Sequence, residues 1–215
     1  MSSDVTVVIP YRSDGSRERE TASTLVGAWY EHFLPGAQIF YFDSDPSRPF
    51  NRSAARNAGV RDTVLAGDRV VVVSDADTYC EPEGLLEAIE AAEDGRLHIP
   101  YRDVIFHDRL GRSTRAVGSQ GGVFVMDPAE WLSVGGMNET LEGWGFEDPI
   151  FHVVVRNLIG LPTYHDGTIH HLWHPVTWSN TDPDYQRNLA ICREYERADG
   201  DIESVWALVE RDSAL

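Results

Sequence analysis

Four consecutive valines, residues 70–73, constrain the fold more than any other part of the chain. The run is β-branched and uninterrupted, which is typical of a central strand covered on both faces. Asp75 and Asp77 come directly after it, at the carboxyl end where open α/β sheets bind their ligands. Aspartate is also favoured in turns and helix caps, so this Asp-X-Asp alone is compatible with either a turn or a ligand site.

The neighbouring segments predict a layered α/β fold. Apolar runs at residues 5–9 and 38–42 predict strands, and apolar side chains at three-to-four spacing predict a helix after each, the first over 16–33. This alternation predicts a parallel sheet with right-handed crossovers. The other expected elements are a helix from Pro82 to Gly95, strands at 97–101 and 121–126, a hairpin or mobile loop at 102–120, a short helix from 127, an edge strand or loop at 168–174, and helices at about 149–158, 183–197 and 202–211.

Composition limits the class of protein. The chain has 215 residues, of which 42% are hydrophobic, enough for one domain with a full core. We find no apolar stretch of membrane-spanning length and no signal-peptide pattern, so we expect a cytoplasmic protein. The two cysteines are too few for a disulfide framework, although they leave a single bridge open. The net charge of −17 opposes binding to nucleic acid or anionic lipid. The oligomeric state is not indicated.

Short motifs follow one another between about residues 5 and 175. Their sequences are Val-Ile-Pro-Tyr-Arg at 8–12, Phe-Asn-Arg at 50–52, Ser-Asp-Ala-Asp at 74–77, Gly-Gly-Val at 121–123, Gly-Trp-Gly-Phe-Glu-Asp at 143–148 and His-Leu-Trp-His at 171–174. In this order they resemble the metal-dependent GT-A glycosyltransferases, specifically the beta-1,4-galactosyltransferase family. That family has Ile-Pro-Phe-Arg, Phe-Asn-Arg, Asp-Val-Asp, Gly-Gly-Val, Gly-Trp-Gly-Gly-Glu-Asp and Met-X-X-His.

The resemblance implies a fold and an activity. The fold is a single Rossmann-like GT-A domain over 1–215 with a mostly parallel sheet. It would have a nucleotide-sugar-binding half at 5–100, an acceptor and catalytic half at 101–175, and C-terminal helices at 182–215. The activity is transfer of a sugar, with inversion, from a nucleoside diphosphate donor, which we expect to be a UDP-sugar, to a carbohydrate or other hydroxyl acceptor.

The resemblance also implies a metal site at Asp77, His171 and His174. Such mixed nitrogen and oxygen ligands favour manganese, or another divalent cation, over magnesium. Histidine replaces the methionine of the family at residue 171, and this substitution keeps a ligand there. A plain strand with surface histidines is the alternative for 168–174. We expect His170 to point away, since adjacent strand residues alternate faces.

Several positions match residues that hold the donor in the family, although each also has an ordinary structural explanation. They are Pro10, Tyr11, Arg12, Phe50, Arg52, Asp75, Ala76, Asp77, Gly122 and Trp144. Trp144 matches a tryptophan that swings over the bound donor, which would exclude water. Ser13 and Asp14 stand where the family has a second arginine, which weakens the case for uridine diphosphate. Ser119 matches the donor-sugar gate, where a small side chain would admit a 2-acetamido sugar.

Asp148 matches the catalytic base of the family, and Glu147 would hold the acceptor or the donor sugar. Acidic residues are also favoured at a helix start, which is compatible with these roles. The family pattern changes at Phe146 and Pro149, so its acceptor specificity does not transfer.

Three other functions stay open at this point. The first is a retaining enzyme resembling the polypeptide N-acetylgalactosaminyltransferases. The second is a sugar-phosphate nucleotidyltransferase, against which the absence of a glycine-rich phosphate loop at residues 10–16 argues. The third is a non-catalytic carbohydrate-binding module, which would not need Asp77, Asp148, His171 and His174 together.

Overall fold

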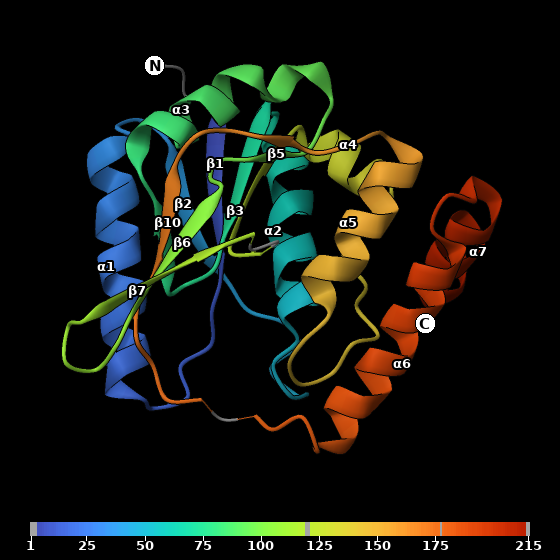
Figure 1. Cartoon of the computed structure of the whole chain (residues 1–215). Coiled ribbons are helices and arrows are strands. Elements are labelled where there is room, and N and C mark those ends of the chain that lie inside the picture. Colours follow the sequence, from blue (N-terminus) through green and yellow to red (C-terminus); the bar gives the residue numbers. More distant parts are fainter. Residues whose placement is uncertain (1–3, 119–120, 177, 214–215) are drawn as a thin grey trace.

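A six-stranded sheet with the order β2-β1-β3-β8-β5-β9 forms the centre of the protein (Figure 1). The computed structural model describes residues 4–118, 121–176 and 178–213. The strands are β1 (Val5–Pro10), β2 (Gln38–Phe42), β3 (Val70–Ser74), β5 (His98–Ile99), β8 (Val123–Met126) and β9 (Thr163–Tyr164). Every residue of β3 is buried, as the valine run predicts. Strands β1, β2 and β3 are parallel, whereas β8 is antiparallel to β3 and β5, so the expected α/β class is confirmed and the sheet is mixed.

A second, four-stranded sheet lies beside the first and has the order β4-β10-β6-β7. Its strands are β4 (Thr78–Cys80), β6 (Asp103–His107), β7 (Ser113–Val117) and β10 (Thr168–His171). The segment expected to be a hairpin or a mobile loop is thus the β6–β7 hairpin. The prediction of an edge strand or loop at 168–174 is wrong for the β10 part, because β10 pairs with β4 on one side and with β6 on the other.

Helices cover both faces of the central sheet, with α1 on one side and α2 and α5 on the other (Figure 1). The helices are α1 (Arg17–Phe33), α2 (Arg52–Ala66), α3 (Pro82–Ala91) with the 3-10 turn η1 (Ala92–Asp94), α4 (Pro128–Ser133), α5 (Glu147–Leu158), α6 (Pro183–Ala198) and α7 (Ile202–Ser213). Helices α6 and α7 pack on α5 and on each other. None of the helices in the described ranges is long and apolar enough to cross a membrane.

Helix α2 is held close to β1, and this approach positions the site. The Asn51 side chain caps its first turn by accepting the Ala54 N–H at 2.9 Å. Further along α2, a Cβ atom at Gly59 would collide with Val8 of β1, so the close contact requires glycine. The same helix then presents Arg52 and Arg56, four residues apart and therefore on one face, towards the end of β3.

Candidate active site

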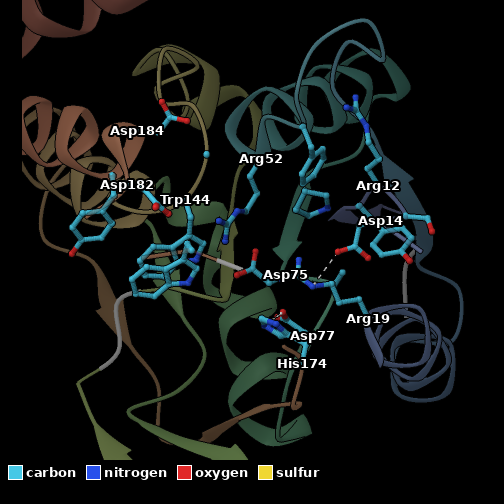
Figure 2. A pocket seen from close by; sticks show the side chains of 18 of the residues that line it. Arg12, Asp14, Arg19, Arg52, Asp75, Asp77, Trp144, His174, Asp182 and Asp184 are labelled. Atoms are coloured by element: carbon cyan, nitrogen blue, oxygen red, sulfur yellow. Dashed lines mark ion pairs between the residues drawn. The ribbon is translucent and has the colours of Figure 1, made fainter. Parts of the chain in front are cut away.

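A pocket of about 610 Å³ lies beyond the carboxyl ends of β1 and β3 (Figure 2). Most of the predicted site residues line it, namely Pro10, Tyr11, Arg12, Phe50, Arg52, Asp75, Ala76, Asp77, Trp144, His171 and His174. Gly122, Glu147 and Asp148 do not line it. This position agrees with the rule that open α/β sheets bind ligands beyond the carboxyl ends of their strands.

The predicted metal ligands come together in space. One ligand atom from each of Asp77, His171 and His174 lies within 4.8 Å of the other two. The pairing of β10 with β4 explains how residues so distant in sequence meet, because His171 lies opposite Thr78. The Leu172 N–H then donates to the Asp77 carbonyl at 2.8 Å. Sheet pairing therefore places a carboxylate and two imidazoles around one point, and this donor set fits a divalent cation.

Hydrogen bonds around His174 orient its ring. Nδ1 lies 3.0 Å from the Pro175 carbonyl, which can only accept, so Nδ1 carries the proton. Nε2 faces Asp77 Oδ2 at 3.0 Å. The Pro175 carbonyl also accepts from Arg19 of α1 at 3.2 Å, which ties this segment to the first helix. A ligand histidine held through its other nitrogen is the usual arrangement at protein metal sites.

The same contacts change the pKa values of the pair. The hydrogen bond to Asp77 raises the pKa of His174, and burial opposes that rise. Burial acts to raise the pKa of Asp77, but the hydrogen bond from His174 and the nearby His171 outweigh it and lower that pKa. Asp77 therefore stays ionised at neutral pH, as a metal ligand requires.

His170 lies outside this cluster. Its ring stacks on Tyr79 at 4.9 Å between ring centres, and its Nδ1 lies 3.0 Å from Nε2 of His107. The alternation of faces along β10 therefore separates His170 from the pocket, in agreement with the expectation from sequence.

A buried arginine joins the Asp-X-Asp to the predicted base. The Arg56 side chain is 1% exposed, and its guanidinium pairs with Asp75 and, at 2.9 Å, with Asp148 Oδ1. Beside it, Arg52 pairs with Glu147 at 3.1 Å. Burial disfavours the charge on Arg56, but Asp75 and Asp148 outweigh burial and raise its pKa. The three acids and the two arginines thus compensate one another, as buried charges must.

Asp148 has the more informative pKa of the group. Burial raises its pKa to about 6, against the lowering effect of Arg56 and with a further rise from Asp75 and Glu147. A carboxylate in this range is ionised at neutral pH and is a stronger proton acceptor than a free aspartate.

Gly121 and Gly122 lie against two of these acids, Asp148 and Asp75. A Cβ atom at Gly121 would collide with Oδ2 of Asp148, so only glycine leaves room for the carboxylate. The Gly122 carbonyl accepts the Asp75 N–H at 2.7 Å and the Thr78 hydroxyl at 3.2 Å. These two glycines therefore connect β8 to both the Asp-X-Asp and Asp148. Ser119, the expected sugar gate, lies outside the described residues.

Arg12 makes contacts that the sequence did not indicate. Its Nε pairs with Asp43 at 2.8 Å, and its two terminal nitrogens donate to the backbone carbonyls of Ser44, Asp45 and Arg48 at 2.7–3.1 Å. Its guanidinium also lies 5.6 Å from the ring centre of Phe50. Arg12 therefore orders the loop that precedes α2, and a contact of Arg12 with the nucleotide stays a prediction.

Sequence reasoning missed Arg56, Trp178 and Tyr185. The signal for Arg56 was its spacing of four from Arg52, which puts both side chains on one helix face. Trp178 and Tyr185 belong to no motif. Their rings lie nearly parallel to Trp144, with centres 3.6–6.2 Å apart, on the opposite side of the pocket from Arg12 and Arg19.

One segment of the chain is similar to a known protein family. Residues 104–156 match a family model described as the N-terminal domain of galactosyltransferase. None of the curated proteins compared with the chain matched it.

Solved structures with the same fold include the catalytic domain of Drosophila beta-1,4-galactosyltransferase 7 in complex with xylobiose. It has 17% identity and a TM-score of 0.61 over 86% of this chain and 79% of that one. A mutant of that enzyme in complex with manganese, UDP-Gal and xylobiose has 16% sequence identity and a TM-score of 0.57. The match covers 86% of this chain and 78% of that one.

GalNAc-T7 with UDP, GalNAc and Mn²⁺ is also similar, with 13% identity and a TM-score of 0.59. The match covers 97% of this chain and 54% of GalNAc-T7, so the present chain spans about half the length of that protein. Structural similarity at such low sequence identity establishes a shared fold. The family model matches the segment that carries Gly-Gly-Val and Gly-Trp-Gly-Phe-Glu-Asp. Together they identify the chain as a glycosyltransferase of the GT-A fold that resembles the beta-1,4-galactosyltransferases.

Proposed function

We propose that the chain transfers a sugar, with inversion, from a nucleoside diphosphate donor to a hydroxyl group of a carbohydrate or other acceptor, and that the donor is a UDP-sugar. The observation that carries this proposal is the meeting of Asp77, His171 and His174 at the pocket that Asp75 also lines. The uridine nucleotides and manganese bound to the structurally similar enzymes support the donor class and the metal.

The residues of the trio fit manganese, because one carboxylate and two imidazoles form the mixed donor set that this metal accepts better than magnesium does. When bound, such a cation neutralises the charge that develops on a leaving diphosphate. The chain contributes the orientation of the ligands. Asp77 is held ionised, and His174 keeps Nε2 directed at the site because Nδ1 bonds to Pro175.

Asp148 is the residue that we propose as the base. The acceptor hydroxyl must lose its proton while it attacks the anomeric carbon from the face opposite the leaving diphosphate, which is a single displacement with inversion. Asp148 follows Trp144 closely in the chain, and Gly143 and Gly145, both with positive φ, flank that tryptophan. Catalytic hydrogen bonds that are long or indirect in a ligand-free enzyme commonly tighten only in the complex.

The direct test is a thermal-shift panel of nucleoside diphosphate sugars with and without manganese. A ligand at a hundred times its Kd stabilises a protein by about 2.7 kcal/mol, so the true donor should raise the Tm clearly, and only with the metal. Anomeric proton couplings of the product then report the stereochemistry. A panel without any stabilising donor would refute the transferase proposal, and a product with retained configuration would refute the inverting mechanism in favour of the retaining alternative.

A further inference from the structure

Arg56 is a charged residue in an almost fully buried position. Only 1% of its side chain is exposed, and it is one of the largest fully buried side chains of the protein. Its guanidinium lies 5.8 Å from the ring centre of Phe124, and its Nη1 lies 3.0 Å from Sδ of Met137. Within the described ranges, its Nε has no hydrogen-bond partner. An aromatic ring and a thioether therefore contact a charge that is held out of water.

The stability of the fold does not call for an arginine at this position. Removing a guanidinium from water is costly, and replacing a whole buried ion-pair group by apolar side chains is often neutral or stabilising. Elsewhere along the same helix, α2 buries small or apolar residues such as Ala55, Gly59 and Val60. We therefore look for the role of Arg56 in its effect on the two carboxylates that it joins, Asp75 and Asp148.

The carboxylate of Asp148 is held by contacts at both of its oxygens. Oδ1 accepts a hydrogen bond from Nη1 of Arg56 at 2.9 Å. Oδ2 lies so close to Gly121 that a Cβ atom built there would be 1.9 Å away. Asp148 belongs to the first turn of α5, so its backbone is fixed as well. Arg56 thus limits the orientations that this side chain can adopt.

Arg56 also balances the charge around Asp148. The charged groups that act on this carboxyl are Arg52 and Arg56 of α2, Asp75 at the end of β3 and Glu147 beside it on α5. Burial is the largest influence and raises the pKa of Asp148, and the two acids raise it further, whereas Arg56 is the strongest influence that lowers it. Without that positive charge, the carboxyl would keep its proton at neutral pH and could not act as a base.

We propose that Arg56 is a positioning residue for the transfer reaction, which fixes the orientation of the Asp148 carboxylate and supplies the positive charge that balances it beside Asp75. The inference rests on the proposed function and adds a residue to it. Arg56 acts through Asp148 and does not line the pocket, so its effect should appear in the reaction step and not in donor binding.

The test separates the charge of Arg56 from its shape. Arg56→Gln removes the charge, whereas Arg56→Lys keeps it but replaces the planar fork by a single ammonium group that cannot hold both acids in the same way. Arg61→Gln is the matched control on the same helix, because Arg61 is half exposed and pairs with the exposed Glu139. Two quantities are measured for each variant between pH 4.5 and 8.5.

The first quantity is the titration of the Asp148 carboxyl carbon, followed by NMR without donor or metal and assigned by its absence from Asp148→Asn. The second is kcat at saturating manganese, from UDP release by the UDP-sugar with the largest thermal shift and with xylobiose or water as acceptor. In Arg56→Gln, the carboxyl titration and the acid limb of kcat should both move up by about one to three pH units.

Arg56→Lys should titrate within about half a pH unit of the wild type, but its kcat should fall at least about tenfold because the base is no longer held in place. The donor KM and the manganese Kd should change less than about threefold in both variants, and Arg61→Gln should behave as the wild type does. A purely structural arginine would not produce this separation between charge and shape.

Unchanged carboxyl titration and unchanged kcat in a folded Arg56→Gln protein would overturn the proposal. Activity losses that lie wholly in the donor KM, or in the folded fraction measured by circular dichroism, would overturn it too. If Arg56→Gln does not fold, Arg56→Lys carries the test, because its kcat per folded molecule must fall.

Turnover by the wild type separates this inference from the proposed function. A wild-type protein that releases nucleotide, with variants that match it, would leave the transferase in place and remove the role of Arg56. A wild-type protein that turns over no donor would refute the proposed function, and the titration of Asp148 would still show whether Arg56 sets the charge of that carboxyl.

Discussion

The end of β3 and the aromatic side of the pocket are built by different physical means. At the end of β3, charged side chains are locked by ion pairs, and the Arg56 guanidinium between Asp75 and Asp148 is almost fully buried. At the other end, Trp144, Trp178 and Tyr185 are only partly covered, and acids surround them. The charged groups at the end of β3 are mostly paired with one another, whereas the aromatic rings stack on one another and stay partly exposed.

This difference suggests a division of labour. Reacting groups need fixed geometry, because a misplacement of about 1 Å costs a large share of the rate. A surface that admits and releases an acceptor needs open apolar area instead. Substitutions at the end of β3 should therefore affect chemistry, metal binding or stability strongly, and substitutions on the aromatic side of the pocket should affect them by smaller factors.

The largest effect is expected from loss of Asp77, the carboxylate of the proposed metal site. Asp77→Ala removes the only carboxylate of the trio, so manganese binding measured by calorimetry should be lost, and donor binding with it. His170→Ala is the control on the neighbouring position, because His170 packs on Tyr79 away from the pocket. Unchanged manganese affinity in Asp77→Ala would contradict the ligand assignment.

Asp148→Asn should come next. Removal of a general base typically costs ~10²–10⁴ in rate, while donor binding should stay near the wild-type value. Asp184→Asn supplies the comparison from the other end of the pocket and should change the rate far less. The test is to measure initial rates and donor Kd values for both variants. Full activity in the Asp148→Asn variant would rule out Asp148 as the base.

Arg56 provides the test of the buried network. Arg56→Met leaves Asp75 and Asp148 without their shared partner, and breaking a buried ion pair costs about 3–5 kcal/mol. Arg61→Met, on the same helix, is the matched control, because Arg61 is half exposed and pairs with the exposed Glu139, a contact worth less than about 1 kcal/mol. Denaturant unfolding of both variants gives the two free energies. Similar losses would show that the charged end is no more rigid than the surface.

The smallest expected effect is a dependence on pH. A base acts in its ionised form, so transfer should rise with pH below the Asp148 pKa of about 6 and become constant above it. At one pH unit below that pKa, the rate should be about one tenth of its constant value at high pH. Manganese must be kept saturating, since protonation of His174 competes with metal binding. A rate independent of pH between 4.5 and 7 would contradict the assignment.

Much of the charged end could be predicted because its residues follow strand ends directly. The buried valine run of β3 predicted where Asp75 and Asp77 would lie, and the order of the motifs indicated His171 and His174 as their partners. The short loop after a buried strand leaves few places for such side chains to go, so local pattern and site position are closely linked.

The positions of Trp178, Tyr185 and Arg56 could not be predicted in the same way. Trp178 and Tyr185 meet Trp144 only because α6 packs against α5 and because the Asn188 side chain of α6 donates a hydrogen bond to the loop before α5. The pairing of β10 with both β4 and β6 likewise joins segments separated by more than 60 residues. An isolated tryptophan or arginine in the sequence carries no information about which distant surface it will meet.

The amino-acid sequence by itself determined the α/β class, the strand that ends on Asp75 and Asp77, and the set of candidate metal ligands. The first two follow from side-chain periodicity, which is a local property, and the candidate metal ligands follow from the resemblance of the short motifs to those of a known family. Only the tertiary structure decided that Arg56 links Asp75 to Asp148, that a second sheet brings His171 beside Asp77, and that the rings of Trp144, Trp178 and Tyr185 stack at the same pocket. Those features depend on contacts between distant segments, and such contacts exist only once the whole core has packed.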